Sequence, residues 1–177
     1  MLFGRTNVNK FLVQEQRRNP ALAGDCTLLI SDVVRTCKSI AQGLSRGALA
    51  EVSIDNANPN PPEEIHRTLD RMANQTFLHH CEWSGHLAAM SSLDMPDIYP
   101  VSNENVRGDY LLVFDPLDGA PNVDVNVTVG SIFGVLARPN GSDVATVADF
   151  LQPGARQVAA GYALYGPSTM LVLTVGT

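Results

Sequence analysis

The sequence predicts a single α/β domain, layered in the α+β manner, over residues 1–177. In the N-terminal half, apolar residues recur every three to four positions, which indicates amphipathic helices. In the C-terminal half, short apolar runs and a period of two indicate strands. Helices followed by strands favour a layered arrangement around one core. Hydrophobic residues make up 45% of the 177, which is enough for a core of useful size.

Composition and charge exclude several classes of protein. Charged residues are only 17% of the chain, and a sequence this apolar does not stay disordered. A formal net charge of -6 argues against nucleic acid or a membrane surface as a partner. No run approaches the roughly 18 apolar residues that span a bilayer. Three cysteines without C-x-x-C spacing form no disulfide framework, so we expect a cytoplasmic protein.

Two helices are expected before the first loop. Residues 9–18 form a short amphipathic segment. The second helix is expected from about Leu28, with Asp25 or Thr27 as its N-cap and Gly47 at its end.

A third helix is expected to follow the loop that residues 55–62 form by composition. Prolines at its start and the acidic pair Glu63 and Glu64 suit the positive end of a helix dipole. Its buried face carries Ile65, Leu69, Met72 and Phe77. The histidines at 79, 80 and 86 fit no standard zinc spacing, which favours structural or surface roles for them.

Strands are expected in the remainder of the chain. Residues 110–114 form an apolar run typical of a buried strand. Valines alternate with polar residues over 123–129, which predicts a strand with one buried face. Two further strands are predicted at 158–164 and 169–175, and residues 139–143 form a turn or loop.

The segment with most chemical content is the acidic turn that follows the first predicted strand. Asp115 lies where that strand ends, and Asp118 follows through a Pro-Leu bend. Such a turn can direct both carboxylates and the Leu117 carbonyl at one point, a donor set that suits Mg²⁺. Gly119 lets the backbone approach a phosphate closely. An ordinary strand-ending turn is the alternative, because Asp-Pro and Asp-Gly are common turn dipeptides.

Four runs of the sequence resemble class 1 fructose-1,6-bisphosphatases. They are DYLLVFDPLDGAPNVDVNVTVGSIFGVL, RTLDRMANQTF, WSGHLAAM and QPGARQVAAGYALYGPSTMLVLT. The resemblance covers nearly the whole chain and implies the sugar-phosphatase fold of the fructose-1,6-bisphosphatase and inositol monophosphatase type. Residues 1–177 would correspond to the N-terminal domain, so we expect the fold to be incomplete, without the C-terminal substrate domain. The implied reaction is Mg²⁺-dependent hydrolysis of the 1-phosphate of fructose 1,6-bisphosphate, giving fructose 6-phosphate in gluconeogenesis or the Calvin cycle.

The resemblance also implies roles for individual residues. Metal binding falls to Asp115, the Leu117 carbonyl and Asp118, and catalytic roles fall to Asp94 and Glu64. Substrate binding is implied for the turn Asp118, Gly119, Ala120, Pro121 and Asn122.

The sequence departs from the family pattern at one of these positions, Pro121, and next to two others, Asp94 and Glu64. Leu93 stands where the family has a metal-binding glutamate, and it offers no side-chain oxygen. Pro121 removes an N–H that could donate to a phosphate. Prolines also stiffen the loop before Glu64, which the family mechanism expects to move.

Two functions therefore remain open. The chain is either a sugar-bisphosphate phosphatase or part of one, or it is a non-catalytic, truncated relative that associates with a full-length paralogue or with itself. A phosphatase of another sugar phosphate or an inositol phosphate is a third alternative. Because later elements that should cover the strands are missing, we expect exposed apolar surface and an oligomer.

Overall fold

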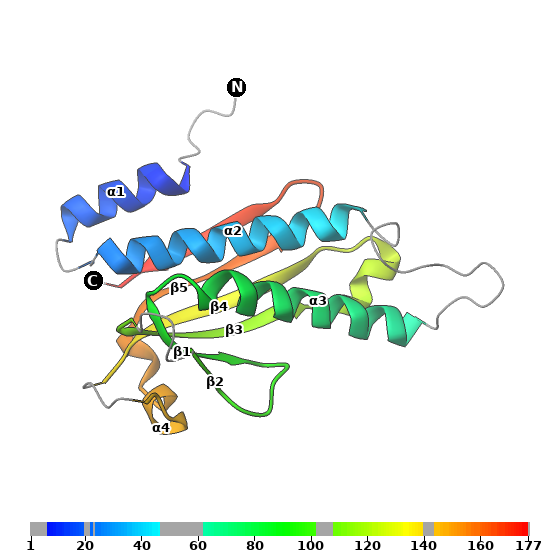
Figure 1. Ribbon diagram of the computed structural model, residues 1–177. Coiled ribbons are helices and arrows are strands. Elements are labelled where there is room, and N and C mark those ends of the chain that lie inside the picture. The colour runs from blue at the N-terminus through cyan, green and yellow to red at the C-terminus, as the bar shows by residue number, and fades with distance from the viewer. Residues whose placement is uncertain are drawn as a thin grey trace.

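The structure, a computed structural model, describes residues 7–19, 22, 24–46, 62–101, 108–139 and 144–176. Its centre is a six-stranded sheet in the order β2-β1-β3-β4-β5-β6, with the long helices α2 and α3 side by side on one face (Figure 1). This arrangement confirms the predicted α+β layers. Among the described residues, no helix combines the length and apolar character needed to cross a membrane.

The helices lie close to their predicted places. They are α1 (Val8–Arg18), α2 (Gly24–Arg46), α3 (Pro62–Glu82) and the short α4 (Val147–Phe150). The predicted N-cap of α2 is wrong, since the helix already includes Gly24 and places Asp25 in its first turn. Thr27 is also inside α2, where its hydroxyl donates to the Gly24 carbonyl at 2.6 Å. Gly47 and the predicted loop up to residue 61 lie outside the described residues.

The strands are β1 (Leu87–Ser92), β2 (Tyr99–Pro100), β3 (Tyr110–Asp118), β4 (Val129–Ala137), β5 (Gln157–Tyr165) and β6 (Met170–Val175). Strands β1 and β3 are parallel, and the other neighbours are antiparallel. The strands predicted at 110–114, 158–164 and 169–175 are confirmed. Sequence analysis missed β1, because its residues are buried on both faces and show no period of two.

The strand predicted over 123–129 is wrong. Ala120–Val125 form the 3₁₀ helix η2, and β4 begins only at Val129. Gly119 precedes η2 with φ 82°, and Asn126 ends it with φ 54°. The valines that alternate in the sequence therefore lie in a 3₁₀ helix and in the exposed loop that follows it.

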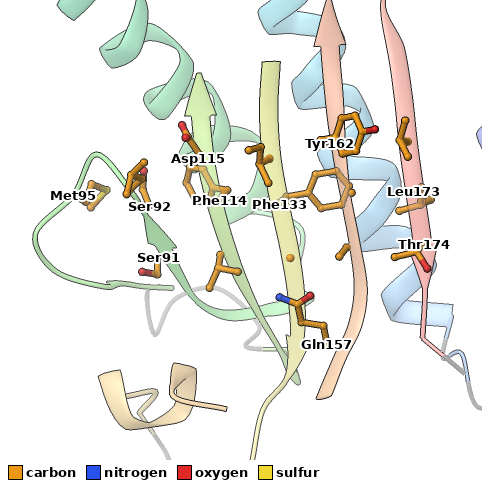
Figure 2. A pocket seen from close by; sticks show the side chains of 17 residues that line it. Ser91, Ser92, Met95, Phe114, Asp115, Phe133, Gln157, Tyr162, Leu173 and Thr174 are labelled. Carbon is orange, nitrogen blue, oxygen red and sulfur yellow. The ribbon is translucent and has the colours of Figure 1, made fainter. Parts of the chain in front are cut away.

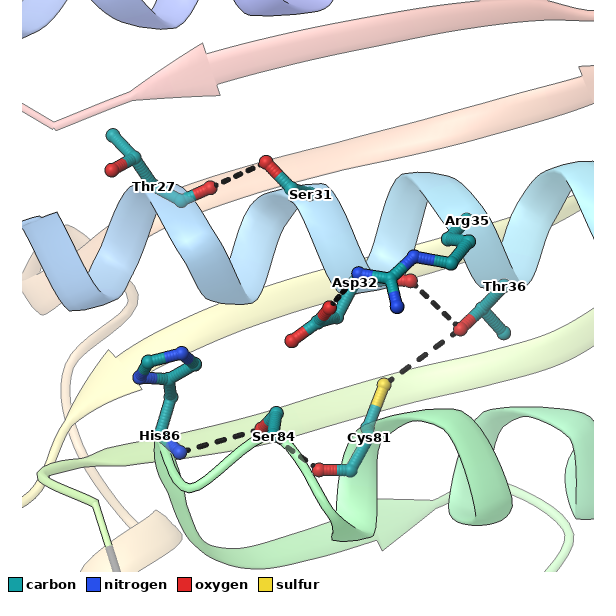
Figure 3. Close-up of polar contacts among 8 residues, drawn as sticks. All are labelled: Thr27, Ser31, Asp32, Arg35, Thr36, Cys81, Ser84 and His86. Atoms are coloured by element: carbon teal, nitrogen blue, oxygen red, sulfur yellow. Dashed lines mark hydrogen bonds and ion pairs between the residues drawn. The ribbon is translucent and has the colours of Figure 1, made fainter.

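The core lies between the sheet and the pair α2–α3. The Phe77 ring of α3 stacks on the Phe114 ring of β3 with centroids 4.5 Å apart. Figure 3 shows the polar side of the α2–α3 contact, where Arg35 pairs with Asp32 and Thr36 lies 3.8 Å from the Cys81 sulfur. Other members of this core include Leu29, Ile30, Val33, Ile40, Met90, Leu112 and Val135.

All three cysteine thiols are expected to be unreactive in the folded chain. Cys26, Cys37 and Cys81 are buried, and burial raises their thiol pKa values to about 11, 11 and 12. Because the thiolate is the nucleophile, Ellman's reagent at pH 8 should label none of them until guanidinium unfolds the chain, when all three should react. Rapid labelling of any thiol under native conditions would contradict this packing.

Candidate active site

The candidate site is formed where the parallel strands β1 and β3 end side by side. Ser92 is in register with Phe114, and the Leu93 N–H donates to the Phe114 carbonyl at 3.0 Å. The turn that follows β1 therefore lies beside Asp115 of β3. Figure 2 shows Asp115 and Ser92 at neighbouring strand ends. Binding sites of α/β sheets commonly form at such carboxyl ends.

A β-bulge separates the two predicted metal ligands of β3. Asp115 pairs with Ile132 and Asp118 with Gly130, so Pro116 and Leu117 stand opposite Ser131 alone. The bulge sets the direction of the Asp115 and Asp118 carboxylates, since one extra residue re-aims the side chains of a strand. The Leu117 side chain is buried and apolar. Only the backbone carbonyl of Leu117 can therefore offer an oxygen ligand at that position.

Carboxylates influence one another across this region. Burial raises the pKa of Asp115, and the charges of Asp118 and Asp94 raise it further, against a hydrogen bond from the Leu117 N–H. Partial burial also raises the pKa of Asp94, whose own N–H donates to Ser92 Oγ at 3.2 Å. The charges of the predicted catalytic Asp94 and the predicted ligand Asp118 are therefore near enough to the predicted ligand Asp115 to raise its pKa.

Asp70 of α3 is a further member of this cluster that sequence analysis missed. Its pKa is raised by burial first, then by the charges of Asp94 and Asp115, while His66 lowers it. The usable signal was the spacing of His66, Asp70 and Asn74, because residues four apart share one helix face. Asn74 reaches the same place, since its Oδ1 accepts from Ser92 Oγ at 2.6 Å. A polar face of α3 thus points at the ends of β1 and β3.

The predicted substrate-binding turn follows the bulge directly. Gly119 adopts the left-handed conformation, and a Cβ on it would lie 3.0 Å from the Asn122 Nδ2. Asn122 and Pro121 are exposed, whereas Ala120 is buried. At the far end of η2, Asp124 pairs with His66 Nε2 at 2.8 Å and joins the turn to α3.

Glu64 stands apart from the cluster, whereas Leu93 lies in the turn beside it without a polar side chain. Glu64 lies exposed in the first turn of α3 and lines a hollow of about 310 Å³ with Glu63, Arg67, Thr68 and Arg71. It is not among the charges that shift the pKa values of Asp70, Asp94 or Asp115. Leu93 lies in the turn itself and is 74% exposed, so its apolar side chain adds little to the stability of the fold.

The residues fit a divalent cation only in part. Within the described segments, no three His, Cys, Asp or Glu side chains gather closely enough to hold a metal ion. Asp115, Asp118 and the Leu117 backbone remain as oxygen donors, and Leu93 contributes none. Hard divalent cations require six or more oxygen ligands, of which water and substrate would have to supply the rest.

Among the described residues, the sheet face opposite α2 and α3 is only partly covered, by Ala145 and Phe150, which pack on Leu111 and Leu136. A groove of about 810 Å³ crosses β3 to β6, and Asp115 is among the side chains that line it (Figure 2). Leu93 also lines this groove. Apolar side chains along it are exposed, among them Ile132 (48%), Tyr162 (41%) and Val172 (41%). Patches of this kind usually mark a surface that another protein segment covers.

Asp115→Asn is expected to stabilise the chain at pH 7 without divalent cations. In the unaltered chain the pKa of Asp115 is raised, so the folded state binds the proton more tightly than the unfolded state does. The ionised Asp115 carboxyl therefore destabilises the fold at neutral pH. That cost vanishes below the unfolded pKa of about 3.9. Thermal unfolding should show a higher Tm for the variant at pH 7, where about 2–4 °C corresponds to roughly 1 kcal/mol, and no difference near pH 3.

Asp149→Asn provides the matched control, with the opposite sign. Hydrogen bonds from Thr146 lower the pKa of Asp149, so its carboxylate stabilises the fold at neutral pH. This variant should therefore have a lower Tm at pH 7. If the Asp115→Asn chain were equally or less stable than the unaltered chain at pH 7, ionisation of Asp115 would not destabilise the fold.

Comparisons with known proteins match both the sequence and the fold. The sequence profile described as "Fructose-1-6-bisphosphatase, N-terminal domain" matches residues 6–177. The class 1 fructose-1,6-bisphosphatase of Hydrogenophilus thermoluteolus is 51% identical over 170 residues, which cover 96% of this chain and 47% of that protein. Structures of Leishmania major fructose-1,6-bisphosphatase are also similar: the holo form has a TM-score of 0.78 at 31% identity, and the T-state form 0.78 at 32%.

These matches define the class first: the chain has the layered α+β fold of a sugar-bisphosphate phosphatase N-terminal domain. It belongs to the fructose-1,6-bisphosphatase family. The Leishmania matches cover 96% and 97% of this chain and 51% of each solved chain. The chain thus spans about half the length of the relatives that it matches.

Proposed function

We propose that this chain carries the N-terminal half of a fructose-1,6-bisphosphatase active site, which hydrolyses the 1-phosphate of fructose 1,6-bisphosphate with Mg²⁺ in the cytoplasm, in gluconeogenesis or the Calvin cycle. The observation that carries the proposal is that the turn after β1, with Asp94, is hydrogen-bonded beside Asp115 of β3, where the charges of Asp94 and Asp118 raise the pKa of Asp115. Among the described residues, no lysine or arginine contributes to the pKa shifts of Asp70, Asp94 or Asp115, which supports a bound cation at this place.

Each residue of the cluster has a task in this proposal. Asp115, the Leu117 carbonyl and Asp118 would hold the cation, which would supply charge neutralisation for phosphate oxygens and a more acidic water. Gly119 leaves room for a phosphate beside the turn, where a Cβ would be crowded. Asp94 accepts a proton from the water, a role that its raised pKa favours. Glu64, in the first turn of α3, is proposed to help activate the attacking water.

The departures from the family pattern limit this activity. Leu93 removes one carboxylate from the metal site, and Pro121 removes one N–H donor from the phosphate turn. Both losses weaken groups that stabilise charge on phosphoryl oxygens. We therefore propose a cation affinity well below that of a site with glutamate at position 93.

Inorganic phosphate release from fructose 1,6-bisphosphate tests the proposal. The 177-residue chain is mixed with a separately expressed second half of a class 1 relative and assayed with and without Mg²⁺. We expect slow, Mg²⁺-dependent release that Asp115→Asn abolishes. Release that is independent of both Mg²⁺ and Asp115 would overturn the proposal.

The partly covered sheet face favours a second candidate function, that of a non-catalytic partner. In that case the exposed groove over β3 to β6 binds a full-length paralogue of the same family. Sedimentation of the chain with a class 1 relative distinguishes the two: a stable complex without any gain in phosphate release would favour the partner role. Self-association of the chain alone would identify a second copy as the occupant.

A further inference from the structure

Two buried hydrogen bonds lie beside the bulge of β3 between Asp115 and Asp118, on the face of the sheet that α2 and α3 cover. Both involve Ser131, whose side chain is fully buried directly opposite Pro116 and Leu117. The Ser131 hydroxyl donates to the Pro116 carbonyl at 2.6 Å. Bulges disrupt the strand ladder locally, and this contact satisfies a carbonyl at the point of disruption.

The direction of the second bond follows from the number of protons. Ser131 has one hydroxyl proton, and it points to Pro116, so the Tyr165 hydroxyl donates to Ser131 Oγ at 2.6 Å. Tyr165 lies at the end of β5, and its hydroxyl and the Cys37 thiol of α2 influence each other's pKa. The two hydrogen bonds thus run from β5 through β4 to the bulge of β3.

We propose that Ser131 and Tyr165 are positioning residues that fix the bulge and thereby the relative placement of the Asp115 carboxylate, the Leu117 backbone and the Asp118 carboxylate. The inference deepens the proposed function and rests on it for the metal. A bulged strand without side-chain support can relax towards regular pairing, which would rotate the residues on either side of Pro116. Outer contacts of this kind commonly change metal affinity by about 10–100-fold when removed.

The test compares Ser131→Ala and Tyr165→Phe with a matched control, Thr36→Val. Thr36 also has a fully buried hydroxyl, which donates to the Asp32 carbonyl at 2.9 Å in the α2–α3 contact. Each variant is examined by native-state amide exchange in NMR and by Mn²⁺ titration. The exchange measurement needs no metal, so it stands even if the unaltered chain binds no Mn²⁺ and the proposed function fails.

In Ser131→Ala we expect the Leu117 and Asp118 amides to exchange at least about tenfold faster, while the paired amides of β4 and β5 stay protected. Mn²⁺ affinity should fall by about tenfold or more. Tyr165→Phe should act in the same direction with a smaller effect, since Ser131 keeps its bond to Pro116. Thr36→Val should leave the bulge amides unchanged.

Three results would overturn the inference. One is unchanged exchange of the Leu117 and Asp118 amides in Ser131→Ala. A second is a parallel rise across all of β4 and β5, which would show a purely structural loss of stability. A third is equal acceleration of the bulge amides in Thr36→Val.

Discussion

Leu93→Glu is expected to tighten binding of Mn²⁺ and Mg²⁺ by roughly tenfold to a hundredfold. Even residues that only orient the ligands of a metal site commonly change metal affinity by about that factor. Leu93 is exposed on the turn beside Asp94, and its N–H is fixed to the Phe114 carbonyl, next to Asp115. A glutamate there adds a carboxylate to a cluster that lacks a third side-chain ligand among the described residues. Isothermal titration of the purified chain with Mn²⁺ measures the change.

Leu93→Gln is the matched control for this substitution. It has the same length as glutamate and a neutral oxygen, so it should recover only a small part of the gain. If glutamine and glutamate gave equal affinities, the charge at position 93 would not be the missing element. If neither bound Mn²⁺ more tightly than leucine, the turn after β1 would not belong to the metal site.

Phe77→Ala is expected to destabilise the chain by about 3–5 kcal/mol, the usual cost of emptying an aromatic site in a core. The Phe77 ring is fully buried and stacked on Phe114, so it joins α3 to β3 immediately before the acidic bulge. Native proteins are stable by only about 5–15 kcal/mol, so this loss is a large share of the total. Urea unfolding followed by circular dichroism measures it.

Leu151→Ala is the control for that experiment, because Leu151 is 79% exposed on a loop. Its substitution should change the free energy of unfolding by less than about 0.5 kcal/mol. A Phe77→Ala chain with unfolding parameters like those of the control would contradict the assigned core between α3 and β3.

Much of the fold could be predicted from the sequence where the period of hydrophobic residues was clear. Helices α1 and α3 and strands β3, β5 and β6 follow from that period within a few residues. The 3₁₀ helix over Ala120–Val125 could not, because a tight helix with alternating valines mimics a strand until Gly119 and Asn126 adopt positive φ angles. Strand β1 was missed because burial on both faces removes the alternation.

The candidate site was predictable only as far as it lies in one segment. Asp115, Asp118 and Gly119 lie within five residues of one strand and its turn, so their proximity is a local property. Asp70 joins them from α3 through the packing of that helix on the sheet, a long-range contact that spacing alone does not give. The Ser131–Tyr165 pair likewise depends on the register of three strands.

The central claim is that this chain keeps the acidic site of its family with one ligand position lost at Leu93. Phosphate release from fructose 1,6-bisphosphate tests it most directly, with the unaltered chain and Leu93→Glu assayed in parallel, each with the second half of a class 1 relative and with or without Mg²⁺. We predict Mg²⁺-dependent release that is at least about tenfold faster for Leu93→Glu. Equal release by the two chains at every Mg²⁺ concentration would contradict the claim.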